Sequence, residues 1–174
     1  ESPVISKFDY GFRAGVKAAN PDAEVMVQYA NSFTDSALGK TIANQMHSKN
    51  ADIIFTCAGA VGIGAIEAAK ENGKKAIGVD QDQNSLAPEN VITSAMKNID
   101  VSVEEMLSKV VDGSYKGGEI IVNTLAMNGV GIPQSSEKNV PPDVLTYVKE
   151  EAEKVKSGEV KVPATKEEFE QLNK

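Results

Sequence analysis

The feature that most constrains the fold is an alternation of short apolar runs with longer segments of helical spacing. Apolar runs of strand length occupy residues 51–57, 75–79 and 91–96, and an alanine-rich helical pattern separates the first two. A run that is apolar at nearly every position is typical of a strand covered on both faces, as in a parallel sheet. Because only a few residues connect successive elements, the pattern predicts an α/β fold with a doubly wound parallel sheet and right-handed crossovers.

Caps, helix breakers and spacing predict the remaining elements. Asp35 or Ser36 can cap one helix and Asp100 another, while Gly158 follows the end of a charged helix. A β-rich run is expected to form a further strand at residues 24–29. The expected helices run through residues 8–19, 38–46, 62–72, 100–111 and 143–156.

Composition narrows the classes of protein that this chain can belong to. The 18 basic and 25 acidic side chains give a net charge of −7, which disfavours nucleic acid or anionic lipid as a partner. No apolar run approaches the roughly 18 residues of a membrane-spanning helix. Cys57 and His47 are the only residues of their kinds, so we expect neither an intrachain disulfide nor a Cys/His metal site. We expect His47 to face solvent and Cys57, inside an apolar run, to be an inert thiol. The first residue is not Met, which is typical of a mature or trimmed chain.

Ligands of doubly wound sheets bind beyond the carboxyl ends of the strands, so the candidate positions are the loops after Cys57, Val79 and Met96. Asp80 ends one apolar run, and its carboxylate can accept hydrogen bonds from neighbouring sugar hydroxyls; the alternative is a cap for the loop that follows. Lys97 ends the next run and can donate to a hydroxyl or a carboxylate; the alternative is an ordinary solvated lysine.

Two aromatic residues and a glycine-rich turn offer further candidates. Phe8, in the first turn of its helix, is better placed than Phe12 to face a cleft and stack on a flat base; the alternative is that both rings belong to the core. The glycines at positions 59, 62 and 64 follow a strand and open a helix, where free backbone N–H groups favour anions or hydroxyl oxygens. Their spacing departs from the dinucleotide fingerprint, and close packing of helix on strand is the alternative.

Sequence motifs of catalysis and of metal binding are lacking. The chain contains no nucleophile elbow, phosphate loop or zinc-protease motif, so we do not expect an enzyme or a cofactor. Asp82 and Asn84 resemble the start of a calcium loop. That loop would need a glycine at its sixth place and an acid where Val91 stands, so calcium is not expected.

A series of motifs along nearly the whole chain resembles the basic membrane protein family, the PnrA-like substrate-binding lipoproteins of ABC transporters. The G-V-D-Q-D-Q and T-S-x-x-K pair is the most specific of them. The motifs are F-D-Y-G-F-R-A-G from Phe8, S-F-T-D from Ser32, C-A-G from Cys57, I-G-V-D-Q-D-Q from Ile77, T-S-A-M-K-N from Thr93 and S-G-E-V-K-V-P from Ser157.

The resemblance implies a type I periplasmic-binding-protein fold, in which two α/β lobes close on a nucleoside, with purine the first candidate. It also implies that Phe8 stacks on the base, that Asp80 and Lys97 reach the ribose hydroxyls, and that Gly59 lies against the ligand. An ABC permease is the implied partner, and the implied location is extracytoplasmic, at the cell surface or in the periplasm, with a lipid anchor on the precursor. A ligand-sensing regulator, a surface antigen and a non-binding fragment are the alternatives on the same fold.

By the topology of that family, this chain corresponds to one lobe and the segments that cross to the other. Residues 1–98 would form the second-lobe α/β domain, and residues 99–127 a crossover that completes the first lobe. Residues 128–174 would supply the return strand, a C-terminal helix and a tail. The apolar faces of the crossover would then lack a partner, which the first lobe or a second copy of the chain would have to supply.

Overall fold

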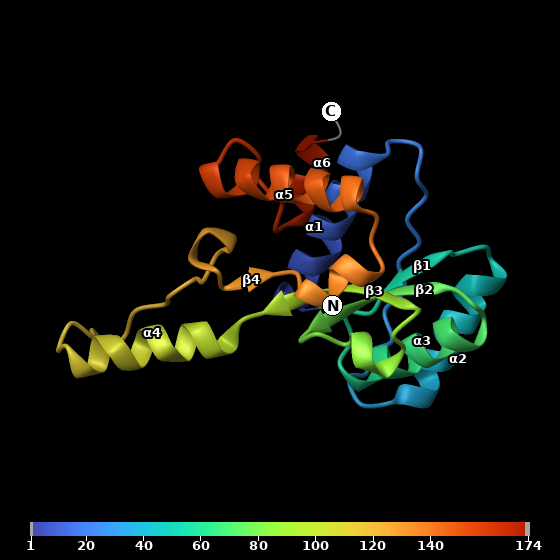
Figure 1. Cartoon of the computed structure of the whole chain (residues 1–174), viewed down its shortest axis with the longest axis horizontal. Coiled ribbons are helices and arrows are strands. Elements are labelled where there is room, and N and C mark those ends of the chain that lie inside the picture. Colours follow the sequence, from blue (N-terminus) through green and yellow to red (C-terminus); the bar gives the residue numbers. More distant parts are fainter. Residues whose placement is uncertain (1, 173–174) are drawn as a thin grey trace.

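A computed structural model describes residues 2–172 as an α/β fold built on a four-stranded sheet of order β1-β2-β3-β4 (Figure 1). The first three strands are parallel, as predicted, and the short β4 pairs with β3 in the antiparallel direction. Helices α2 and α3 lie on one side of the sheet and α1, α5 and α6 on the other, so the sheet is doubly wound. The strands are β1 (Ile53–Phe55), β2 (Lys75–Asp80), β3 (Val91–Lys97) and β4 (Val130–Gly131). The helices are α1 (Pro3–Ala19), α2 (Ser36–Ser48), α3 (Ala60–Glu71), α4 (Ile99–Val111), α5 (Pro142–Ser157) and α6 (Lys166–Leu172).

Local sequence explains where most helices begin and end. Asp35 is the N-cap of α2, and its Oδ1 accepts a hydrogen bond from the Leu38 N–H at 2.9 Å, as predicted. Gly158 ends α5 with φ +80°, a conformation that glycine adopts without a steric penalty. The predicted capping role of Asp100 was wrong, because α4 begins at Ile99 after Asn98. Asp100 lies instead in the first turn, where its charge favours the positive end of the helix dipole.

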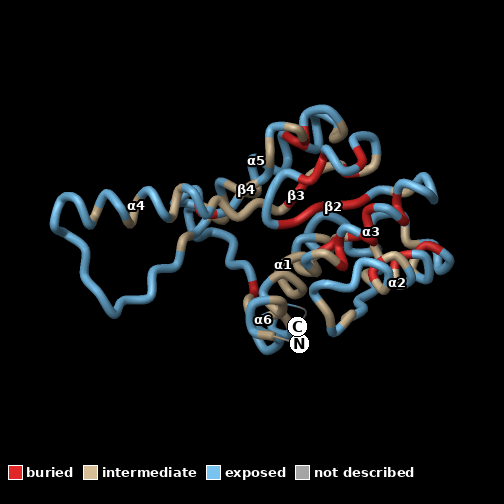
Figure 2. The backbone as a smooth tube through the Cα atoms, turned by 90° about the horizontal axis from the view of Figure 1, so that it is seen from below, coloured by how far each residue is buried: buried red, intermediate tan, exposed pale blue. Residues whose placement is uncertain are grey.

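The buried core lies where α2 and α3 cover the sheet. One apolar cluster joins α3 to β2 and β3 and a second joins α2, α3 and β1 (Figure 2). The two helices approach so closely that a Cβ on Gly64 would lie 1.9 Å from the Ser36 carbonyl oxygen. A Cβ on Gly62 would lie 2.6 Å from the Thr56 carbonyl oxygen. Close packing, rather than phosphate binding, therefore accounts for these two glycines. The clusters are Ile66, Ala69, Ala76, Ala87 and Val91, and Ala43, Ile54, Ala65 and Ala68.

The strand predicted at residues 24–29 does not form. This segment has no regular secondary structure, and an apolar groove of about 850 Å³ separates it, α1 and α2 from the outer edge of β1. β1 is only three residues long and pairs only with β2. A β-rich segment becomes a strand only through ladder hydrogen bonds to a neighbour, and propensity alone does not supply them.

Residues 99–124 form an arm that extends away from the body (Figures 1 and 2). α4 has no buried residue, and Val103, Leu107 and Val110 are all more than half exposed. Ile120, further along the arm, is 94% exposed. The expectation that these apolar faces lack a partner within the chain is confirmed for the part of the sequence that the structure describes.

Among residues 2–172, no helix combines the length and the apolar character needed to cross a membrane.

His47, expected to face solvent, is instead buried at the end of α2, where its Nδ1 lies 3.0 Å from the Ala51 carbonyl oxygen. The polar neighbours of His47 in the sequence misled the prediction, because the ring points back over the turn that enters β1.

Candidate functional site

Three of the four predicted site residues meet at one edge of the sheet. Asp80 ends β2 and Lys97 ends β3, and the parallel register pairs Asp80 with Met96, so the two charged residues are neighbours. The Lys97 ammonium nitrogen lies 2.8 Å from Asp80 Oδ1 and 4.9 Å from the centre of the Phe8 ring. The Asp80 side chain is 52% exposed and that of Lys97 36% exposed, so both charges are accessible from solvent.

Aromatic packing holds Phe8 beside the strand ends. The Phe8 ring centre lies 6.3 Å from that of Phe55 on β1, and Phe12 packs closer to Phe55, at 5.0 Å. Phe12 therefore helps to seat α1 on the sheet. Phe8, one helical turn earlier, presents a ring face to the Lys97 ammonium, an attractive cation–π contact.

Gly59, the fourth predicted residue, lies on the loop between β1 and α3. It is the N-cap of α3 with φ +59°, and a Cβ there would lie 2.9 Å from the Phe33 carbonyl oxygen. That carbonyl accepts a hydrogen bond from the Ala60 N–H at 2.8 Å. Glycine is therefore required both by the backbone angle and by the close approach. Phe33, whose side chain is exposed, was not predicted as a site residue, although its S-F-T-D motif was one of those that carry the resemblance.

Cys57 lies between β1 and Gly59, on the same loop. Burial raises the pKa of the Cys57 thiol to about 11; Lys97 lowers it and Asp80 raises it by smaller amounts. At neutral pH the thiol is protonated, which agrees with the prediction of an unreactive cysteine.

The polar loop after Asp80 serves structural purposes. Asp82 Oδ1 accepts a hydrogen bond from the Asn84 N–H at 3.0 Å, and Asn84 Nδ2 donates to the Val91 carbonyl at 2.9 Å. These side chains shape a turn, and no group of three His, Cys, Asp or Glu among residues 2–172 could hold a metal ion.

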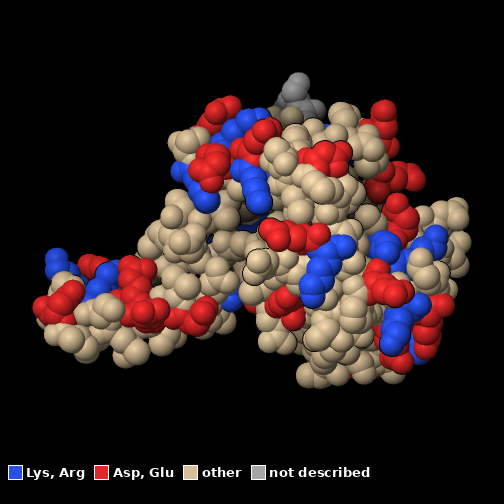
Figure 3. Space-filling model, viewed as in Figure 1, with Lys and Arg blue, Asp and Glu red and all other residues tan. Residues whose placement is uncertain are grey.

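On the face in Figure 3, acidic and basic side chains are interspersed and form no continuous basic surface of the kind that binds a nucleic-acid backbone.

Comparison with known proteins identifies the family of this chain. A profile of the family described as "ABC transporter substrate-binding protein PnrA-like" matches residues 1–166. The chain is 38% identical over 171 residues to basic membrane protein B of Borreliella burgdorferi, covering 96% of this chain and 48% of that protein. It is 39% identical over 176 residues to the CD4+ T-cell-stimulating antigen of Listeria monocytogenes, covering 92% of this chain and 49% of that protein.

The structure is similar to a solved ABC transporter solute-binding protein from Conexibacter woesei. The TM-score is 0.78 at 25% sequence identity, and the match covers 94% of this chain and 54% of that one. The chain thus spans about half the length of the curated relatives it matches.

Proposed function

Because the chain belongs to the PnrA-like family of ABC transporter substrate-binding proteins, we propose that it forms part of a two-lobed solute-binding protein that holds a nucleoside, with a purine base as the first candidate. The family that the motifs predicted is thereby confirmed, and the ligand is the proposal. One observation carries it: an aromatic ring, an ammonium group and a carboxylate lie together at the carboxyl ends of two parallel strands.

Each group in this arrangement has chemistry that suits one part of a nucleoside. The Phe8 ring offers a flat apolar face on which a base can stack. The Asp80 carboxylate accepts two hydrogen bonds from the vicinal ribose hydroxyls, and Lys97 donates to a ribose oxygen. Lys97 leaves the face of Phe8 when the base takes that place. Gly59 lets the backbone of its loop approach the ligand without a side chain between them.

The same proposal assigns the three parts of the chain. Residues 1–98 are the second-lobe domain, residues 99–127 the crossover to the first lobe, and residues 128–174 the return strand, C-terminal helix and tail. The exposed apolar side chains of the arm support this division, because a 13-residue helix without packing partners is marginal in water. The first lobe, or a second copy of the chain, covers these side chains.

We place the protein outside the cytoplasm, lipid-anchored in its precursor, where it delivers its ligand to an ABC permease. The match to a substrate-binding family supports a binding protein rather than an enzyme. The net charge of −7 supports a small-molecule ligand in preference to nucleic acid.

Calorimetric titration of the two-lobed protein tests the ligand. Purine nucleosides, pyrimidine nucleosides, free bases and ribose are compared at one pH and ionic strength. We expect purine nucleosides to bind at least about tenfold more tightly than the free bases, since only nucleosides offer hydroxyls to Asp80 and Lys97. Equal affinity for base and nucleoside, or no binding of any nucleoside, would contradict the proposal.

A further inference from the structure

The backbone turn that presents Asp80 is strained. Asp80 has φ +69°, and the Gln81 N–H donates across it to the Val79 carbonyl at 2.8 Å. A hydrogen bond between residues two apart, around a centre of positive φ, is the rare and strained form of the γ-turn. Such a conformation persists only where the surrounding structure enforces it.

Gln83 supplies that enforcement from within the protein. Its Oε1 accepts a hydrogen bond from the Val79 N–H at 2.9 Å, and its own N–H donates to Ser94 Oγ at 3.1 Å. Gln83 is 8% exposed and Ser94 is fully buried, so neither bond competes with water. The register of β1 on β2 ends at Phe55, opposite Ile77, so Val79 has no partner on β1. Gln83 therefore takes the place of a strand at the point where β2 turns into the site.

The sequence leaves space for this arrangement at Gly78. A Cβ at this position would lie 2.5 Å from Ser94 Oγ and 2.8 Å from Gln83 Oε1. Ser94 stands directly opposite Gly78 in the register of β2 and β3. The absence of a side chain at Gly78 is thus what allows Gln83 and Ser94 to reach the Asp80 turn.

We propose that Gln83 is a positioning residue for ligand binding: anchored by Ser94, it holds the strained turn at Asp80 and so keeps that carboxylate beside Lys97. Gln83 is buried beneath the turn and does not itself meet the ligand. This inference rests on the proposed function, because it assigns Gln83 a role through the contact of Asp80 with ribose hydroxyls.

The first test uses Gln83→Met in the two-lobed protein, which keeps the length of the side chain and removes the acceptor. Affinity is measured for a purine ribonucleoside and for its 2′,3′-dideoxy analogue, which lacks both hydroxyls. We expect the ribonucleoside to bind about tenfold more weakly and the analogue to change less than about twofold. In an Asp80→Ala background, Gln83→Met should cause no further loss, because residues that act through one contact are not additive.

A second test needs no ligand. Hydrogen exchange of the Val79 amide, followed by NMR, should accelerate at least about tenfold in Gln83→Met, since its acceptor is gone. Ser94→Ala probes the same arrangement from its other end and serves if Gln83→Met does not fold. Ser136→Ala is the matched control: its hydroxyl is equally buried but pairs with Thr93, at 2.7 Å, away from the Asp80 turn. It should change neither the affinity ratio nor the Val79 exchange.

The outcomes separate the two proposals. If the parent protein does not distinguish the ribonucleoside from its dideoxy analogue, the proposed function fails. If the parent does distinguish the two ligands and Asp80→Ala removes the difference, the proposed function stands. The role of Gln83 then depends on the affinities measured for Gln83→Met. Equal weakening of both ligands would show that Gln83 has only a structural role, and unchanged exchange at Val79 would show that Gln83 does not hold the turn. Either result would overturn the inference.

Discussion

Asp80→Asn should separate ligand binding from folding. Asparagine has nearly the shape of aspartate and, like it, tolerates the positive φ found at this position. The substitution removes the charge that lies 2.8 Å from the Lys97 ammonium. Any effect on binding therefore reports the carboxylate rather than a rearranged turn.

The geometry sets the expected magnitudes. Because the pair is largely open to solvent, its loss should lower the free energy of unfolding by no more than about 1 kcal/mol. Hydrogen bonds to a charged group contribute about 1.5–3 kcal/mol each, and a neutral amide can replace one of two acceptors. We therefore expect nucleoside affinity to fall by about 10- to 150-fold.

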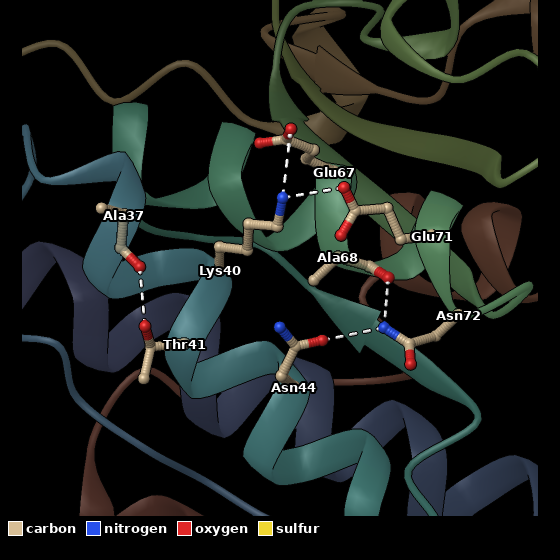
Figure 4. Close-up of polar contacts among 8 residues, drawn as sticks. All are labelled: Ala37, Lys40, Thr41, Asn44, Glu67, Ala68, Glu71 and Asn72. Atoms are coloured by element: carbon tan, nitrogen blue, oxygen red, sulfur yellow. Dashed lines mark hydrogen bonds and ion pairs between the residues drawn. The ribbon is translucent and has the colours of Figure 1, made fainter.

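Calorimetry of binding and urea unfolding measure the two quantities on the same samples. Glu71→Gln is the matched control: the Glu71 carboxylate is also 52% exposed and lies 2.8 Å from the Lys40 ammonium, between α2 and α3 (Figure 4). It should leave affinity unchanged. Affinity of Asp80→Asn within about twofold of the parent, or an equal loss in both variants, would refute the role of Asp80.

Three further substitutions or reactions test the fold and the site. Gly64→Ala should lower the free energy of unfolding, measured in urea, by about 1–3 kcal/mol, because its Cβ would meet the Ser36 carbonyl. Gly15→Ala is the control and should not destabilise the chain, because the space around Gly15 is open. Equal effects of the two substitutions would contradict the close packing. The raised pKa of Cys57, about 11, should slow alkylation of the thiol at pH 8 about 100-fold relative to the unfolded chain. The alkylation rate should increase toward pH 11 as the thiolate forms. A rate equal to that of the unfolded chain would refute the burial of Cys57. Leu107→Ala should barely change the free energy of unfolding of the 174-residue chain, because this side chain is exposed there. In the two-lobed protein the same substitution should lower the free energy of unfolding by about 2–5 kcal/mol if the arm is buried. An equal effect in the two proteins would count against a covered arm.

Several elements were predictable because their signals are local. The apolar runs at 51–57, 75–79 and 91–96 coincide with β1, β2 and β3, although β2 and β3 each extend one residue further, to Asp80 and Lys97. Asp35 caps α2, as its position indicated. Strand and helix periods, caps and breakers act over a few residues and need no knowledge of distant neighbours. The same locality explains the order of elements and therefore the fold class.

The features that the sequence did not predict depend on tertiary contacts rather than on local sequence signals. Residues 24–29 have strand propensity but lack the neighbouring ladder that would make them a strand. His47 lies in a polar stretch, yet its ring is buried, with Nδ1 3.0 Å from the Ala51 carbonyl oxygen. Gln83 belongs to the I-G-V-D-Q-D-Q motif, but its neighbours along the chain do not indicate that its side chain accepts a hydrogen bond from the Val79 N–H.

The sequence by itself determined the alternation of elements, the positions of the strand ends, and hence the loops that could carry Asp80, Lys97 and Gly59. Only the tertiary structure decided that Phe8, from the first helix, meets Lys97 at the end of β3 while Gly59 stays on the adjacent loop. The physical reason is that strand ends follow from local periodicity, whereas the meeting of side chains far apart in the sequence depends on how α1 packs onto the sheet through Phe12 and Phe55.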